Sequence, residues 1–419
     1  MEKSRKPKIR FKGFTDDWEQ REFSEMFDCT ISNNTLSRSE LSYEEGSILN
    51  IHYGDILIKY GSILDIHKYK IPRIPNEKKE DFRGSLLQPG DIVIADTAED
   101  ETTGKACEIG SLFGNSIVAG LHTMVARPNI EMASGYLGYY LNSNAYHCQL
   151  LPMMQGIKVL SLSRANVKKT ALKFPESTKE QQLIANYFIQ LDELITLHQR
   201  KLDKLVNVKK SMLEKMFPQQ GSRIPEIRFC GFTDDWEQRK LVELLTKYTD
   251  EVNVPHNGYE RLGIRSHAKG TFHSYVSEGH ELQTGKMHKV AADKFIVNIT
   301  FGWEHAVAVT DKNDAGKLVS HRFPQYSLSE NLYSKFFKYI ILDDKFKHHL
   351  WLSSPGGAGR NRVLKLDEML EYKIKIPNVQ EQQKIAEVLM DLDHLITLHQ
   401  RKLEKLKNIK KSMLEKMFI

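Results

Sequence analysis

Apolar residues recur in alternating steps of four and three along two stretches of about forty residues each. Steps of this kind form a heptad seam, the pattern of a coiled coil, and predict two long helices. At 1.5 Å per residue, each helix would be roughly 55–60 Å long. The seam positions are Ile184, Phe188, Leu191, Ile195, His198, Leu202, Leu205, Met212 and Met216 in the first stretch, and Ile385, Leu389, Leu392, Ile396, His399, Leu403, Leu406, Met413 and Met417 in the second.

The two helices belong to an internal repeat. Residues 9–21 return as residues 227–239 with one change, Lys12 to Cys230, while residues 194–202 and 210–217 are identical to residues 395–403 and 411–418. Between these blocks, residues 28–170 and 240–370 have almost nothing in common. A period of about two hundred residues excludes a solenoid and indicates a duplicated pair of domains. Surface kept identical in both halves is expected to meet two copies of one partner, and surface that differs is expected to meet two different targets.

Chain order and charge both predict that the helices pack antiparallel. The first helix leaves one divergent segment and delivers the chain to the other, whereas the second helix follows the second segment. The first half of each helix is acidic and the second half is basic. Antiparallel packing therefore sets opposite charges against each other, and the basic ends suit the helix dipole.

The divergent segments look like one α+β module with different loops. In the first, Gly54-Asp55 and Gly90-Asp91 introduce apolar runs that predict strands, and a helix is expected over residues 136–149. In the second, strands are expected at residues 294–298 and 306–309, followed by a helix over residues 332–349. Each module then has a glycine loop, at residues 155–162 and 355–364.

The loops carry side chains suited to nucleic acid. Arg, Lys, Asn, Gln and His can bond to base edges, and glycine allows close approach. A net charge of +6 is compatible with a polyanionic partner. The candidate DNA-binding residues are Lys59, Tyr60, Lys68, Thr97, Lys105, His122, Gln155 and Lys158 in the first module, and Arg265, His267, Lys269, Thr300, Trp303, His305, His321, Arg322, Arg360, Asn361 and Arg362 in the second.

Other features argue against chemistry in this chain. The four cysteines are far apart, which fits a reducing cytoplasm and offers neither a disulfide framework nor a zinc knuckle. Residues 102–106 lack the spacing of a P-loop, and no glycine-rich turn for S-adenosylmethionine follows a strand. His198 and His399 read as core-edge histidines of the seam rather than as a metal pair, and no metal site is expected. No apolar run is long enough to span a bilayer.

With two divergent modules, two near-identical helices and the repeated block Gly-Phe-Thr-Asp-Asp-Trp-Glu-Gln-Arg, the chain resembles the specificity subunit of a type I restriction–modification system. The pair of Glu-Gln-Gln-x-Ile-Ala motifs at residues 180–185 and 381–386 is typical of that family. The resemblance covers essentially the whole chain. It implies an α+β fold with two globular α/β target-recognition domains, separated by a long antiparallel coiled-coil pair of helices and related by a pseudo-two-fold repeat.

The resemblance also implies the function. Each recognition domain would bind one half of a split, asymmetric site in double-stranded DNA, and the helices would fix the gap between half-sites, which two readers on a rigid spacer can address about 34 Å apart. Two methylation subunits that hold S-adenosylmethionine and methylate adenine would dock on the helices. Restriction subunits that use ATP and Mg²⁺ would join them, leaving this chain without catalytic residues or cofactors. The candidate partner-binding residues are Trp18, Trp236, Met212, Met216, Met413 and Met417.

The expected domain limits are residues 1–176 and 219–377 for the two recognition domains, and 177–218 and 378–419 for the two spacer helices. Two other hypotheses remain open on the sequence. A self-sufficient DNA-modifying or cleaving enzyme would act without partners, and a coiled-coil scaffold that binds only proteins would retain no specific DNA.

Overall fold

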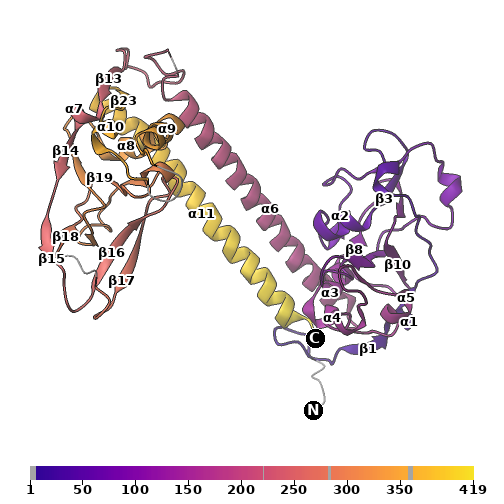
Figure 1. Cartoon of the computed structure of the whole chain (residues 1–419). Coiled ribbons are helices and arrows are strands. Elements are labelled where there is room, and N and C mark those ends of the chain that lie inside the picture. The colour runs from indigo at the N-terminus through magenta and orange to yellow at the C-terminus, as the bar shows by residue number, and fades with distance from the viewer. Residues whose placement is uncertain (1–5, 220, 282–284, 357–361) are drawn as a thin grey trace. The chain divides into compact units, whose positions relative to one another are not determined.

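A computed structural model describes residues 6–219, 221–281, 285–356 and 362–419, which form two compact units. Unit 1 comprises Met1–Arg200 and Gln400–Ile419, and unit 2 comprises Lys201–His399. Two long helices, α6 (Thr178–Lys215) and α11 (Val379–Met417), contribute to both units. Each unit thus holds one divergent segment, the start of one long helix and the end of the other (Figure 1).

Unit 1 is built on a five-stranded sheet of order β2-β10-β6-β8-β4. Its strands are β2 (Phe27–Asp28), β10 (Thr123–Pro128), β6 (Ile92–Ala95), β8 (Ala106–Ile109) and β4 (Ile63–Leu64). Three smaller sheets pair β5 (Arg73–Ile74) with β3 (Ile48–Ile51) and β9 (Ser116–Ala119), β1 (Glu19–Glu22) with β12 (Ala171–Phe174), and β7 (Thr97–Ala98) with β11 (Leu160–Ser161). The helices are α1 (Phe23–Met26), α2 (Tyr53–Ile58), α3 (Tyr136–Leu141), α4 (Asn144–His147) and α5 (Arg164–Val167), with 3₁₀ turns at Arg38–Glu40, Lys79–Phe82 and Leu151–Met153.

The five-stranded sheet is buried on both faces. Along β6, Ile92 and Ile94 face a core with α3, α4 and the start of α6, whereas Val93 and Ala95 face a second core with α2 and the small β5-β3-β9 sheet. Successive side chains of a strand point to opposite faces, so a strand covered on both sides must be apolar throughout. The uninterrupted run at residues 92–95 therefore predicts this position correctly.

Unit 2 repeats the plan with two larger sheets. The first has the order β14-β22-β19-β20, with β14 (Leu245–Tyr248), β22 (Gln325–Leu328), β19 (Lys294–Val297) and β20 (Val307–Val309). The second has the order β15-β18-β21-β16-β17, with β15 (Glu251–Asn253), β18 (Lys286–Lys289), β21 (Leu318–Val319), β16 (Tyr259–Ile264) and β17 (Thr271–Val276). A further pair joins β13 (Glu237–Lys240) to β23 (Lys373–Ile376), and the shorter helices are α7 (Leu241–Leu244), α8 (Ser334–Ile340), α9 (Asp344–Leu352) and α10 (Leu366–Leu370), with a 3₁₀ turn η4 (Gly302–Glu304).

The two units match strand for strand at their centres. The order β2-β10-β6-β8 in unit 1 corresponds to β14-β22-β19-β20 in unit 2. The ribbons β1·β12 and β13·β23 are both antiparallel with four paired positions, from Glu19↔Phe174 and Glu237↔Ile376 onward. Two segments with almost no sequence in common thus keep one framework, because the buried pattern of apolar residues is preserved while the loops differ.

The sequence expectations for local structure hold in part. Strands appear at β6, β19 and β20 as predicted. The run after Gly54 is instead helix α2, because the His52 side chain caps it at Gly54 N and Asp55 turns inward to an ion pair with Arg38. The single helices predicted over residues 136–149 and 332–349 are each broken in two, at residues 142–143 and 341–343.

Each unit contains an antiparallel contact between the long helices. In unit 1, Lys410 Nζ near the end of α11 lies 2.6 Å from Asp192 Oδ1 near the start of α6. In unit 2, Lys209 Nζ and Asp393 Oδ1 form the same contact with the helices exchanged, also at 2.6 Å. The predicted fold class, with two α/β units and antiparallel long helices, is therefore confirmed. Among the described residues, no helix has the length and apolarity that crossing a membrane requires.

Candidate nucleic-acid interface

Three loops converge at one edge of unit 1. The loop after β6 and the loop before β10 are joined by a bond from Asp96 N to His122 O of 3.1 Å. The glycine loop joins them through Leu162 N to Asp96 O, at 2.8 Å, and through the pairing of β11 with β7. Of the candidate residues, the structure brings Thr97, His122, Gln155 and Lys158 onto these loops.

The polar groups of this edge are linked but open to solvent. The Asp96 carboxylate accepts a 2.8 Å hydrogen bond from Thr97 Oγ1 and lies 3.5 Å from His122 Nδ1. The His122 ring stands edge-on to Tyr53, with a centroid distance of 5.2 Å. Lys158 is exposed, next to the fully exposed Ile157. The edge thus offers a cation, a hydroxyl and an imidazole to a ligand from solvent.

The same three loops converge in unit 2. Ile299 N donates to Arg322 O at 3.0 Å, which joins the loop after β19 to the loop before β22. Leu364 N donates to Ile299 O at 2.9 Å and adds the end of the glycine loop, so Leu364 stands where Leu162 stands in unit 1. We call this arrangement the three-loop site of each unit: residues 96–97, 121–122 and 155–162 in unit 1, and 299–305, 321–322, 355–356 and 362–364 in unit 2.

Cations and aromatic rings dominate the three-loop site of unit 2. Arg322 Nη1 donates to Thr300 Oγ1 at 3.1 Å, and the Arg362 guanidinium lies over the Trp303 ring at 5.8 Å. The turn between β16 and β17 adjoins it, because His267 N donates to Glu304 O at 2.9 Å. Arg265, His267 and Lys269 of that turn are exposed, as is His321. Arg360 and Asn361 lie outside the described residues.

Three candidate residues point into the fold. Tyr60 is buried, and the Lys105 ammonium group donates to the carbonyl oxygens of Leu57 and Tyr60 at 2.9 and 3.3 Å. Burial lowers the pKa of Lys105. His305 is also buried, and its Nε2 lies 2.7 Å from Ile341 O. In place of the predicted DNA contact, we assign these three residues to supporting the loops around them.

Lys59 and Lys68 lie apart from the three-loop site. The Lys59 ammonium group lies 5.5 Å from the centre of the Tyr43 ring, and Lys70 lies at the same distance from that ring. Lys68 is exposed beside Tyr69. The Lys59 ammonium group also donates to the carbonyl oxygen of Lys70.

A part-buried ion pair that the sequence did not reveal anchors each long helix. Arg10 forms two hydrogen bonds of 2.7 and 2.8 Å to the Glu180 carboxylate, and Arg228 forms two of 2.8 Å to Glu381. Both glutamates are the first residue of a Glu-Gln-Gln motif and are buried. The arginine of the repeated segment and the glutamate of the repeated motif are therefore kept in both halves because they bind each other.

The following glutamine ties each helix to its module. Gln181 accepts a bond from Ala133 N at 2.9 Å and donates to Pro175 O at 2.8 Å. Gln382 accepts from Tyr333 N at 2.9 Å and donates to Pro377 O at 2.8 Å. Since a buried amide without partners is costly, these bonds fix the direction in which the helix leaves the module.

Four of the residues predicted to bind partners are core residues. Trp18 and Trp236 are each 1% exposed, and Met216 and Met417 are each 3% exposed. The end of α11 packs beside α3 and α4 in unit 1, where Phe418 and Met417 join the core around Trp18 (Figure 1). The end of α6 packs in the same way on Trp236 in unit 2. These four side chains hold the helix ends in place and have no free surface for a partner.

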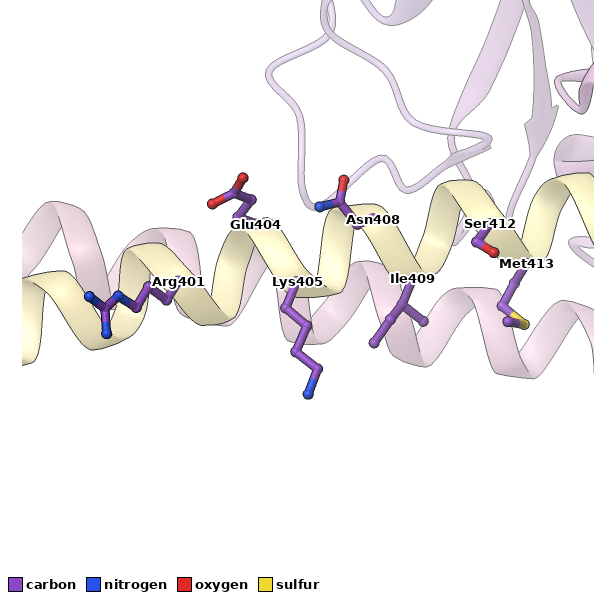
Figure 2. A pocket seen from close by; sticks show the side chains of 7 residues that line it. All are labelled: Arg401, Glu404, Lys405, Asn408, Ile409, Ser412 and Met413. Atoms are coloured by element: carbon purple, nitrogen blue, oxygen red, sulfur yellow. The ribbon is translucent and has the colours of Figure 1, made fainter. Parts of the chain in front are cut away.

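Repeated surface remains exposed on the outer faces of the helices. An open hollow of about 550 Å³ lies along α11. Figure 2 shows the side chains that line it, with Met413 at one end. The corresponding positions of α6 have five identical residues and two conservative changes, Glu404 to Asp203 and Ile409 to Val208. The hollow is lined by Arg401, Glu404, Lys405, Asn408, Ile409, Ser412 and Met413.

Exposed leucines add an apolar component to the repeated surface. Leu194 and Leu197 of α6 are 44% and 46% exposed, and their counterparts Leu395 and Leu398 of α11 are each 40% exposed. Large apolar side chains that lie together on a solvent-exposed face are typical of protein–protein contact sites. Of the predicted partner-binding residues, only Met212 and Met413 are half-buried rather than core.

The described residues contain no group of three or more His, Cys, Asp or Glu side chains placed to hold a metal ion. One carboxyl group stands out by its burial. Glu108 on β8 accepts bonds from Gly135 N and Gly138 N, at 2.5 and 2.9 Å, and burial raises its pKa to about 7. Its position beneath α3, away from the loops, marks it as a structural group.

Comparisons with known proteins agree with this architecture. A sequence profile of the type I restriction modification DNA specificity domain matches residues 15–207 and again residues 234–408. The putative type I restriction enzyme MjaX specificity subunit of Methanocaldococcus jannaschii is 24% identical, over 95% of this chain and 92% of that protein. The MjaVIII specificity subunit of the same organism is 23% identical, over 56% and 58%. The crystal structure of an S subunit from M. genitalium covers 99% of both chains with a TM-score of 0.58 at 12% identity, which shows a common fold.

Proposed function

Because the chain belongs to the type I restriction–modification DNA specificity family, a non-catalytic family of specificity subunits, we propose that each of its units reads one half of a split DNA site. One observation carries the proposal. Both units build a three-loop site on the same strands with the same backbone bonds, yet fill it with different side chains. A duplicated frame with different contents is what reading two different half-sites requires.

The proposed base and phosphate contacts follow from exposure at the loops. Side chains on a rigid sheet edge can approach base edges, while flanking cations neutralise phosphate and set the register. We assign Thr97, His122, Gln155 and Lys158 to the first half-site, with Lys59 and Lys68 on the flanking phosphates. We assign to the second half-site Arg265, His267, Lys269, Thr300, Trp303, His321, Arg322 and Arg362.

The long helices are proposed to set the gap between half-sites and to bind partners. Their lengths of 38 and 39 residues and their contacts within each unit make them suitable as a spacer. The repeated outer surface, with Leu194 and Leu395 and the hollow around Lys405, is proposed to bind two copies of one methylation subunit. The near-identity of this surface on both helices supports the proposal, because two equal partners need two equivalent sites.

Catalysis is assigned to those partners. The methylation subunits would hold S-adenosylmethionine and transfer its methyl group to adenine, and restriction subunits would use ATP and Mg²⁺. This chain would hold no cofactor and contribute the choice of sequence.

Genome-wide mapping of methylated adenine, in the host with and without this gene, tests the proposal. Deletion is expected to abolish methylation at one split, asymmetric motif, whose two halves are the targets of the two units. An unchanged methylome, with the methylation subunit expressed, would contradict the assignment and favour a scaffold that binds only proteins.

A further inference from the structure

One cation of unit 2 lies against two aromatic rings. The Arg362 guanidinium lies 5.0 Å from the centre of the Trp351 ring and 5.8 Å from the centre of the Trp303 ring. Trp351 is itself stacked on His348, with a centroid distance of 6.0 Å and an interplanar angle of 12°. A guanidinium over an indole face is attracted by the ring quadrupole, so the two rings restrict where it can lie.

The backbone beside Arg362 is fixed as well. Two residues on, Leu364 N donates to Ile299 O at 2.9 Å. On the other side, a Cβ added to Gly356 would lie 2.7 Å from Arg362 Cγ and 3.2 Å from its Cα. Only glycine allows that approach without displacement. Both the side chain and the main chain at Arg362 are therefore positioned by their surroundings.

The guanidinium donors, in contrast, have no partner among the described residues. Within the described part of the chain, Arg362 makes no hydrogen bond and no ion pair, whereas Arg10, Arg127 and Arg228 are each paired with a buried carboxylate. An arginine has five N–H donors in a planar fork, and such a fork matches the O6 and N7 acceptors of guanine in the major groove. A preorganised fork without a partner in its own chain is suited to a partner in the ligand.

At the corresponding position, the described residues of unit 1 have no cation. The residue two positions before Leu162, which makes the bond corresponding to that of Leu364, is Leu160. Leu160 pairs with Ala98 in the β11·β7 ribbon and offers no cation. A contact made by Arg362 would therefore belong to one half-site only.

We propose that Arg362 is a specificity-determining residue that reads one guanine in the half-site bound by unit 2, with Trp303 and Trp351 as its positioning residues. The inference rests on the proposed function, since it names the base that one of the two units selects. A contact between Arg362 and phosphate would instead contribute affinity without base specificity.

A double-mutant cycle between protein and DNA tests it. The complex with its methylation subunit is measured by fluorescence anisotropy on a duplex carrying the motif found by methylome mapping. Each guanine in turn is replaced by 7-deazaguanine, which lacks the N7 acceptor. One replacement is expected to weaken binding of the unmodified complex at least about threefold, because it removes one of the two acceptors of a bidentate contact worth about 1–3 kcal/mol. The same replacement is expected to change the affinity of Arg362→Ala by less than about twofold.

Two further variants separate the alternatives. Arg362→Lys keeps the charge but not the planar fork, and is expected to fold and to keep only a reduced sensitivity to 7-deazaguanine, because an ammonium group still donates to guanine N7 but is not held by the two rings in the same way. Lys158→Ala, in the glycine loop of unit 1, is the matched control and is expected to leave that sensitivity unchanged.

Several results would overturn the inference. If Arg362→Ala weakens binding to specific and non-specific duplexes equally and lowers the salt dependence, the residue contacts phosphate. If every 7-deazaguanine effect persists in Arg362→Ala and Arg362→Lys, guanine is not read by this residue. A complex that recognises no split motif would contradict the proposed function itself, whereas a split motif without this coupling contradicts the reading by Arg362 alone.

Discussion

Truncation of Phe418 to alanine is expected to destabilise unit 1, although the residue is the penultimate one of the chain. Phe418 is 3% exposed and lies within 6.4 Å, centroid to centroid, of the rings of Trp18, Tyr136, Tyr140 and Phe188. Replacing a buried phenylalanine of this kind by alanine costs about 3–5 kcal/mol. The loss falls on unit 1 because all four neighbouring rings belong to it.

Phe217 provides the matched comparison at the end of α6. It is half-buried and contacts two rings, Trp236 at 5.9 Å and Phe336 at 5.5 Å. With fewer ring neighbours and more exposure, Phe217→Ala is expected to cost about half as much, roughly 1.5–2.5 kcal/mol, and to act on unit 2. The two residues occupy identical positions in the repeat, so their difference measures packing alone.

Urea unfolding combined with amide hydrogen exchange checks both values. Phe418→Ala is expected to lower protection in α3 and α4 of unit 1, and Phe217→Ala in α8 of unit 2. If Phe418→Ala costs no more than Phe217→Ala, or if protection in α3 and α4 is unchanged, the end of α11 does not support unit 1 as described.

Three further predictions follow from buried charges and the repeated surface. Burial raises the pKa of Glu108 to about 7, so the folded unit favours the neutral carboxyl group. The free energy of unfolding of unit 1 should therefore fall by about 2–3 kcal/mol from pH 5 to pH 8, as the group ionises. Glu108→Gln should flatten this pH profile in urea titrations. Glu381→Gln removes the charge partner of the half-buried Arg228 and should destabilise unit 2 by about 1.5–3 kcal/mol, and a change below about 0.5 kcal/mol would show that the pair does not hold the helix start. Leu194→Asp should weaken co-purification of the methylation subunit without lowering the melting temperature, and normal stoichiometry would place docking elsewhere.

The long helices could be predicted because their signal is local and repeated. The heptad steps predict α6 and α11, and the charge pattern predicts their direction, which Lys410–Asp192 and Lys209–Asp393 confirm. The ion pairs that hold the helix starts, Arg10–Glu180 and Arg228–Glu381, could not be predicted in the same way. Arg10 and Glu180 are 170 positions apart, and each taken alone looks like an ordinary solvated charge.

For the candidate interface, the sequence indicates which loops to consider but not which side chains face the solvent. Thr97, His122 and Lys158, chosen by residue type and loop position, lie on loops that the structure brings together, but the sequence cannot tell which polar side chain of a short loop turns inward. Lys105 and His305 find carbonyl acceptors inside the fold, and those acceptors come from residues 36 or more positions away. The repeat led to one wrong inference, that the two tryptophans bind a partner. Trp18 and Trp236 are identical in both halves because they fill equivalent cores rather than because they bind a common partner.

A module exchange tests most directly the claim that each unit reads its own half-site. Phe23–Thr170 would replace Leu241–Tyr372, since the same backbone bond closes both modules, Phe23 N to Thr170 O at 2.8 Å and Leu241 N to Tyr372 O at 2.9 Å. Mapping of methylated adenine in cells that carry the exchanged chain is expected to reveal a split motif in which both halves are copies of the one read by unit 1. Retention of the original asymmetric motif, or loss of methylation from an intact complex, would contradict independent reading by the two units.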